Sequence, residues 1–252
     1  MEDYPEYPEF PVPPPAFDGT SRVVDPGACF EWLRMGWAGF IANPGVWIAS
    51  AVLAMILFFG LSIVPIAGQL AANLLVPIIG AGFVHMARRQ GREEDIEIED
   101  LFVGFRHNAG GLVMVGVFYM LSILAMAFIV MVVAGGGVIG GMMMGTRPGG
   151  LGFALGGLLL ALLLVTALLV PVMMAFWFAP ALVFFHNMQP LDSLKASFYA
   201  CAKNWLPFLV YGVILVVLFF FAALPLGLGF LVLIPVLAGA QYASYRDVFA
   251  GV

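Results

Sequence analysis

Three stretches of this chain share one pattern, in which a short amphipathic segment ends in an asparagine and a long uncharged apolar run follows. They are Trp37-Ala-Gly-Phe-Ile-Ala-Asn43, Phe102-Val-Gly-Phe-Arg-His-Asn108 and Phe198-Tyr-Ala-Cys-Ala-Lys-Asn204. An amphipathic helix beside an apolar run is typical of a segment that lies in the membrane interface. The pattern therefore predicts a membrane protein built from three similar helical units.

Each unit also contains a branched residue followed by proline inside its later apolar sequence. These pairs are Val76-Pro77, Val170-Pro171 and Ile234-Pro235. We interpret each unit as a helical hairpin preceded by a cytoplasmic interfacial helix. The three repeats are expected near residues 25–88, 96–186 and 190–250, which together form one domain over residues 25–252.

The composition agrees with this interpretation, since 63% of the 252 residues are hydrophobic and only 10% are charged. Soluble domains carry about 25% charged residues, whereas a transmembrane helix needs about 20 mostly apolar residues. We expect an all-α integral membrane protein with six transmembrane helices. The six runs without Asp, Glu, Lys or Arg are approximately Val46–Val64, Leu70–Ala87, Leu112–Ala134, Phe153–Phe176, Leu206–Leu224 and Gly227–Tyr245.

The basic residues predict how the chain is oriented in the membrane. Nine of the ten Lys and Arg residues fall in the tail, between the hairpins or near the C-terminus, and Arg147 lies in the middle hairpin loop. Loops rich in Lys and Arg stay in the cytoplasm. Both termini are therefore expected to be cytoplasmic.

Three asparagines and three prolines are candidate structural joints of the hairpins. Asparagine tolerates left-handed backbone conformations and caps exposed backbone groups, whereas proline interrupts helical hydrogen bonding. Pro171 and Pro180 are also expected to kink the fourth apolar run, which continues to about Phe185. The six joints are Asn43, Asn108, Asn204, Pro77, Pro171 and Pro235.

Residues 1–24 are acidic, proline-rich and aromatic, and we expect a disordered or extended cytoplasmic tail. Tyr4, Tyr7 and Phe10 recur every third residue. That spacing matches the three-residue turn of a polyproline helix, so the three rings can share one face. The alternatives are a tail without contacts and a motif that docks on a partner or on the protein's own helices.

No catalytic pattern stands out in the sequence. It contains no phosphate-binding loop, dinucleotide fingerprint, nucleophile elbow or zinc-protease motif. Met142-Met143-Met144 could bind a soft ion, but consecutive methionines point in different directions and neither Cys nor His accompanies them. We expect no enzymatic activity, no cofactor, no metal and no nucleic-acid partner.

The joined motifs resemble an uncharacterised family of small proteobacterial inner-membrane proteins. The resemblance rests on Gly36-Trp-Ala-Gly-Phe-Ile-Ala-Asn-Pro-Gly-Val-Trp47, Asp100-Leu-Phe-Val-Gly-Phe105, Leu191-Asp-Ser-Leu-Lys-Ala-Ser-Phe198 and Lys203-Asn-Trp205. More distantly, the chain is similar to the membrane domain that accompanies some glycerophosphodiester phosphodiesterases. The resemblance implies a bacterial cytoplasmic membrane and six helices, and it brings no catalytic residues.

These observations favour a non-enzymatic membrane protein that acts through contacts with lipids or with protein partners. An accessory subunit, an assembly factor and a scaffold all fit this description. The alternative is a transporter or channel for a small neutral or apolar solute, because repeated hairpins with proline-interrupted helices suit moving elements around a central site. The sequence leaves both functions open.

Overall fold

The computed structural model describes residue 17 and residues 19–144 and 149–249, and every regular element in these ranges is helical. The connectors are short, and prolines open several helices, as Pro44 does for α2 and Pro190 for α8. In chain order the elements are α1 (Ala28–Ala42), α2 (Pro44–Ser62), α3 (Ala67–Gly91), η1 (Ile98–Phe102), α4 (Val103–Arg106), α5 (Ala109–Met144), α6 (Gly150–Trp177), α7 (Ala179–His186), α8 (Pro190–Lys203), α9 (Trp205–Ala223) and α10 (Phe230–Val248).

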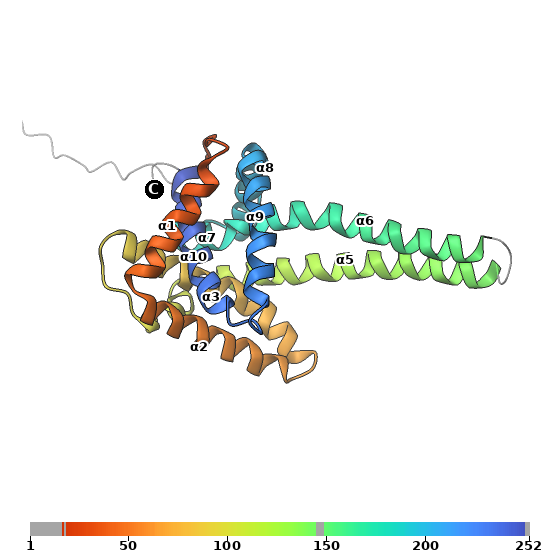
Figure 1. The fold of residues 1–252 in the computed structure, drawn as a ribbon, viewed down its shortest axis with the longest axis horizontal. Coiled ribbons are helices and arrows are strands. Elements are labelled where there is room, and N and C mark those ends of the chain that lie inside the picture. Colours follow the sequence, from red (N-terminus) through yellow and green to blue (C-terminus); the bar gives the residue numbers. More distant parts are fainter. Residues whose placement is uncertain (1–16, 18, 145–148, 250–252) are drawn as a thin grey trace, which may run out of the picture.

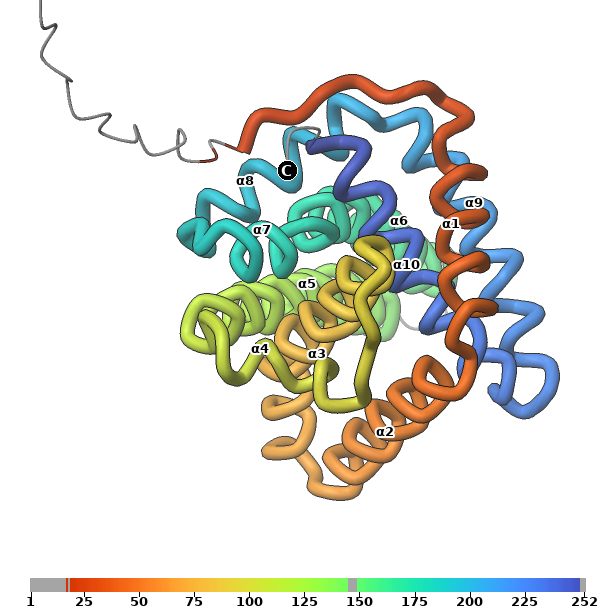
Figure 2. The backbone as a smooth tube through the Cα atoms, turned by 90° about the vertical axis from the view of Figure 1, so that its left-hand side faces the viewer, coloured from red at the N-terminus to blue at the C-terminus, as the bar shows by residue number. Residues whose placement is uncertain are grey.

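The helices form a body from which one long hairpin projects (Figure 1). We call the hairpin α5–α6, from about residue 121 to residue 170, the arm. Figure 2 looks at the molecule from the body end, where the other helices lie around the near ends of α5 and α6. In Figure 1, α9 runs across the direction of the arm instead of along it.

The core of the body is aromatic and lies around α10. Trp32 of α1, Phe178 at the start of α7 and Phe249 after α10 are at most 2% exposed. Phe178 contacts Phe249 edge to face, with ring centroids 5.3 Å apart. Trp32 belongs to the same buried cluster as Phe178 and Phe249, so the core joins α1 to helices from the last third of the sequence.

Helices α1 and α10 approach each other closely enough that only glycine fits at their crossing. A Cβ atom on Gly36 would lie 2.1 Å from the carbonyl oxygen of Val236, and a Cβ on Gly239 would lie 2.7 Å from the Cα of Gly36. Small residues allow such close helix packing in membranes, where hydrophobic burial gives little drive for association. The crossing therefore fixes α1 directly on α10.

Five helical segments are long and apolar enough to cross a membrane, namely α2, α3, α5, the combined segment Gly150–His186 and α9. The sixth expected span is helical as α10. Its last turns carry Gln241, Arg246 and Asp247, however, and the helix does not reach the same apolarity. The structure thus supports several apolar helices, and the count of six spans stays a prediction.

The arrangement as three similar repeats is not confirmed either. The helix after Asn108 has 36 residues, whereas the helices after Asn43 and Asn204 have 19 each. The middle hairpin also points away from the body, unlike the other two (Figure 1). A helix therefore begins after each asparagine of the shared motif, but the three hairpins differ in length.

Two of the amphipathic helices, α1 and α8, bury one face against the body and expose apolar side chains elsewhere. In α1 the buried side is Cys29, Trp32, Gly36 and Phe40, whereas Trp37 is 49% exposed. In α8 the buried side is Ser193, Leu194, Ser197, Ala200 and Cys201, and Leu191 is exposed. The exposed apolar side chains suit helices that lie in the membrane interface, and this placement stays a prediction.

Candidate functional site

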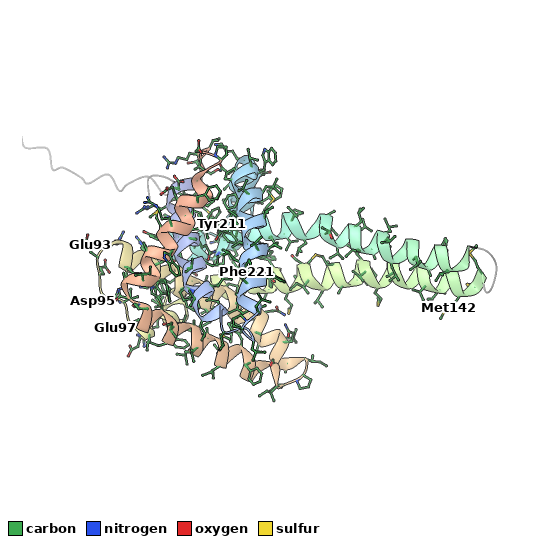
Figure 3. The ribbon with its side chains drawn as sticks, viewed as in Figure 1. Glu93, Asp95, Glu97, Met142, Tyr211 and Phe221 are labelled. Atoms are coloured by element: carbon green, nitrogen blue, oxygen red, sulfur yellow. The ribbon has the colours of Figure 1, made fainter. Side chains whose placement is uncertain are left out.

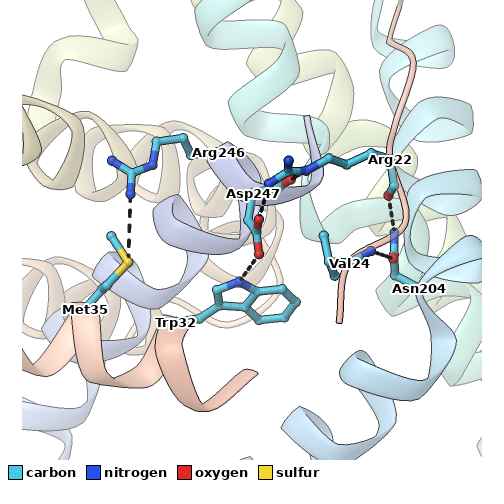
Figure 4. Close-up of polar contacts among 7 residues, drawn as sticks. All are labelled: Arg22, Val24, Trp32, Met35, Asn204, Arg246 and Asp247. Carbon is cyan, nitrogen blue, oxygen red and sulfur yellow. Dashed lines mark hydrogen bonds and ion pairs between the residues drawn. The ribbon is translucent and has the colours of Figure 1, made fainter. Parts of the chain in front are cut away.

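Asn204 lies at the joint between α8 and α9, where it holds the N-terminal segment. Its amide oxygen accepts a hydrogen bond from the Val24 backbone N–H at 2.8 Å, and its amide nitrogen donates to the Arg22 carbonyl at 2.9 Å (Figure 4). The same nitrogen also donates to the Ala200 carbonyl at 2.9 Å. Asn204 is 2% exposed, so its side chain is a buried connector between distant parts of the chain.

Asp247 of α10 ties the same segment to α1. Its carboxylate pairs with the guanidinium of Arg22 and accepts the indole N–H of Trp32 at 3.0 Å (Figure 4). The Arg22 backbone N–H donates to the Val248 carbonyl at 2.9 Å. Residues 19–24 therefore form an extended strap across α8, α10 and α1.

The strap continues to Phe17, whose ring stacks on His186 with centroids 4.0 Å apart. The His186 Nε2 atom lies 2.5 Å from the hydroxyl oxygen of Tyr245 on α10. The part of the expected tail from residue 17 to residue 24, where described, is thus extended and docked on the body. Tyr4, Tyr7 and Phe10 lie outside the described residues.

Asn43 and Asn108 also lie at helix junctions. Asn43 separates α1 from α2, and its carbonyl accepts the Trp47 N–H at 3.3 Å. Asn108 has φ of +54° just before α5, and its side-chain amide donates to the Val183 carbonyl at 2.9 Å. At the first junction, Gln90 adds a connection that the sequence did not reveal, since it bonds both the Trp47 indole and the Gly39 carbonyl.

The three candidate prolines lie inside helices that continue through them. Pro77 and Pro235 are buried in α3 and α10, and Pro171 lies in α6. The fourth apolar run breaks further along, at Phe178, where α6 ends and α7 begins. Pro180 follows in the first turn of α7, where its missing N–H leaves no helical bond unmade.

Two polar residues from other helices stabilise this break. The Ser197 hydroxyl donates to the Met174 carbonyl at 2.7 Å and accepts the Phe178 N–H at 2.9 Å, so it replaces a direct helical bond between those two groups. Gln241 donates to the Trp177 carbonyl at 2.6 Å. A side chain inserted into the helical ladder is a known cause of kinks. Ser197 was not predicted from the sequence, because its two partners lie 19 and 23 residues earlier in the chain.

A cavity of about 420 Å³ opens where α9 crosses the end of α6. The α6 side carries Val170, Met173 and Trp177, and the α9 side includes Tyr211 and Gly212. Figure 3 labels Tyr211 on the body side of the molecule and Met142 at the far end of the arm. Two residues of the cavity wall, Trp177 and Tyr211, carry buried polar atoms.

The buried cysteines are poorly suited to chemistry. Cys29 and Cys201 are free and at most 1% exposed. Burial raises the pKa of the Cys29 thiol, and it raises the pKa of Cys201 to about 12. Because the thiolate is the reactive form, both side chains are expected to react slowly in the folded protein.

Titratable residues gather in one further place, at the cytoplasmic end expected for α3. Arg89 forms two hydrogen bonds with the Asp100 carboxylate, at 2.7 and 2.9 Å, and His85 Nε2 lies 3.9 Å from the same carboxylate. Within the described residues, no group of three His, Cys, Asp or Glu side chains is placed to hold a metal ion. Met142, Met143 and Met144 end α5, and the first two are at least 75% exposed.

The fold and this site define an all-helical membrane protein whose polar contacts hold helices together. The chain is 30% identical over 221 residues to a probable inner membrane protein of Burkholderia thailandensis, and the match covers 85% of this chain and 80% of that protein. The chain belongs to the family of that protein and is an inner-membrane protein with several apolar helices.

Two further comparisons found nothing. No protein-family profile matches the chain, and no solved structure matches it. The expected likeness to the membrane domain of glycerophosphodiester phosphodiesterases therefore has no support.

Proposed function

We propose that the protein is a non-enzymatic integral membrane protein that acts through protein or lipid contacts, as an accessory subunit, assembly factor or scaffold of a membrane complex. The observation that carries this proposal is the arm. Neither α5 nor α6 contains a charged residue. Large apolar side chains on both helices, such as Phe128, Leu159 and Leu163, are more than 60% exposed.

The length and surface of the arm suit helix contacts inside a bilayer. From residue 121 to the end of α5 it rises about 36 Å at 1.5 Å per residue, enough to cross a ~30 Å hydrocarbon core. Gly137 and Gly157 face each other inside the hairpin, whereas a Cβ on Gly152 or Gly156 would meet nothing within 4 Å. Glycines four residues apart let a further helix approach closely, so this open side favours a partner helix.

The test is purification from native membranes in a mild detergent, with the wild type compared with Gly156→Leu. We expect a stoichiometric membrane partner with the wild type and reduced recovery with Gly156→Leu. Gly60→Leu in α2 is the matched control, because a Cβ there also meets nothing within 4 Å. Equal recovery of every co-purifying protein by all three chains would contradict a contact through the arm.

Six spans with both termini in the cytoplasm complete the proposal. Two basic residues, Lys203 and Arg88, contact other segments of the body. Lys203 donates to the Ser21 carbonyl, and Arg88 lies over the Phe185 ring at 4.6 Å. Glu93, Asp95 and Glu97 lie at the opposite end of the molecule from Met142 (Figure 3). The basic residues beside this connector, Arg88, Arg89 and Arg92, support an orientation with the connector inside and the arm tip outside.

Introduced cysteines test this orientation, because the native Cys29 and Cys201 are buried and are expected to react slowly with a maleimide. In sealed cells, a membrane-impermeant maleimide should label Met143→Cys and should label Asp95→Cys only after the membrane is opened. Both positions are exposed. Labelling of Asp95→Cys in sealed cells would place the connector outside.

The tail with Tyr4, Tyr7 and Phe10 is proposed as a second contact for a partner. Acidic residues between the rings suit a basic groove, which would make association salt-sensitive. Since residues 19–24 hold the body together, the deletion must stop at residue 16. Deletion of residues 1–16, or Tyr4→Ala with Tyr7→Ala, should lower partner recovery without lowering protein levels, and unchanged recovery at every salt concentration would refute the idea.

The alternative, transport of a small neutral or apolar solute, is favoured by the apolar cavity between α6 and α9. A carrier would be recovered from membranes as a lone oligomer. Its solute flux in vesicles would fall when the cavity is filled by Gly212→Leu. A stoichiometric partner with no flux supports the accessory role instead.

A further inference from the structure

The cavity between α6 and α9 has the shape and lining of a site for a hydrocarbon chain. Along α9 it extends from Trp205 to Val216, a distance of about 16 Å at 1.5 Å per residue. None of its lining residues is charged. Residues at its rim, including Val170, Val213 and Val216, are at least 55% exposed on the apolar outer surface. A long apolar molecule can therefore enter from the bilayer, whereas an ion would find no counter-charge.

Two hydrogen-bond donors in the wall of this cavity lack a partner. The Tyr211 hydroxyl and the Trp177 indole N–H are buried, and neither has a hydrogen-bond partner among the described residues. Both residues line the cavity, and their rings pack edge to face with centroids 5.6 Å apart. Buried donors normally find a partner, because leaving one unpaired is costly. Tyr211 is 2% exposed, so bulk water does not supply a hydrogen-bond partner for its hydroxyl.

We infer that this cavity binds one membrane lipid with an ester-linked acyl chain. The chain lies along α9, and an ester carbonyl accepts a hydrogen bond from Tyr211 or Trp177. Ester lipids have both the apolar chain that the cavity requires and the acceptor that the two donors require, since the ester oxygen lies at the head of the hydrocarbon chain. This inference deepens the lipid-contact part of the proposed function and does not depend on a protein partner.

Gly212 offers a way to fill the cavity without disturbing the fold. It lines the cavity, and a Cβ built on it meets nothing within 4 Å. Gly60→Leu is again the matched control, because Gly60 is an equally open helical glycine outside the cavity. Native mass spectrometry of detergent-purified protein, titrated with a synthetic diester glycerophospholipid, measures retention of a single lipid. We expect one lipid on the wild type and on Gly60→Leu, and at least ten-fold weaker retention by Gly212→Leu.

The ester is tested with a diether analogue that has the same headgroup and chain length. The wild type should retain the diester about five-fold more strongly, which corresponds to one hydrogen bond. Tyr211→Phe combined with Trp177→Phe should lose this preference. Equal retention of diester and diether by the wild type, or equal retention by Gly212→Leu and Gly60→Leu, would overturn the inference. If Gly212→Leu does not accumulate, the diester-to-diether ratio of the wild type decides alone. Partner recovery through the arm is a separate readout and can fail independently.

Discussion

The body and the arm solve the problem of helix packing in different ways. In the body, polar side chains such as Asn204, Ser197 and Gln241 reach across helices to backbone groups. In the arm, the polar side chains Ser122 and Thr166 bond only to the preceding turn of their own helices. The arm helices approach each other closely at glycines, and many of their large apolar side chains are exposed.

This difference indicates where the specificity of the fold resides. Lipid tails are as apolar as leucine, so hydrophobicity alone does not select one helix arrangement inside a bilayer. Hydrogen bonds and close backbone contacts do select one, and they are concentrated in the body. The arm has neither on its outer face, which leaves that face available for lipids or for another protein.

The largest difference between the two regions is expected for alanine in place of glycine. Gly36→Ala would place a Cβ 2.1 Å from the Val236 carbonyl oxygen, so α1 and α10 must separate. We expect a loss of about 3 kcal/mol in the free energy of unfolding, at the upper end of the cost of overpacking. Titration of the purified protein with a denaturing detergent measures this loss.

Gly156→Ala in the arm is the counterpart, because its Cβ would meet nothing within 4 Å. Alanine is the better helix former by about 0.5–1 kcal/mol, so this variant should be neutral or slightly stabilised. The two substitutions thus have opposite expected signs. A stable Gly36→Ala protein would mean that α1 does not pack on α10 as described.

Asn204→Ala should have the next largest effect. It leaves the buried Val24 N–H without its acceptor and releases the Arg22 carbonyl. An unpaired buried donor costs about 1–3 kcal/mol, so we expect a loss of about 2 kcal/mol and faster protease cleavage within residues 19–24. Asn43→Ala, whose side chain makes no cap hydrogen bond to α2, is the control and should change cleavage little.

The sequence predicted the features that depend on composition and on single residues. The asparagine junctions and the apolar helices followed from apolar runs and amphipathic segments, whereas the inner-membrane location followed from the resemblance to a family of inner-membrane proteins. The sequence did not predict the hydrogen bonds of Ser197 or Asp247, because each depends on residues 19 or more positions away in the chain. The close contact of α1 with α10 was not predicted for the same reason, since Gly36 becomes important only once α10 is beside it.

Ser197→Ala and Thr166→Ala compare one chemistry in the two regions. Ser197 bridges the Met174 carbonyl and the Phe178 N–H across helices, whereas Thr166 bonds only to Leu162 in its own helix. We expect Ser197→Ala to lose about 1–2 kcal/mol and Thr166→Ala to lose less than about 0.5 kcal/mol. The same detergent titration measures both. Equal losses would show that the break between α6 and α7 holds without Ser197.

Arg22→Gln should have the smallest effect on the free energy of unfolding, although it removes the ion pair between the strap and Asp247. The side chains of Arg22 and Asp247 are 56% and 30% exposed, and exposed ion pairs contribute about 0–1 kcal/mol. The backbone bond from Arg22 to Val248 and both bonds to Asn204 remain in this variant. We therefore expect a loss below about 0.5 kcal/mol that vanishes at high salt, where screening removes the attraction in the wild type as well. A larger loss that persists at high salt would mean that the guanidinium, and not Asn204, holds the strap to the body.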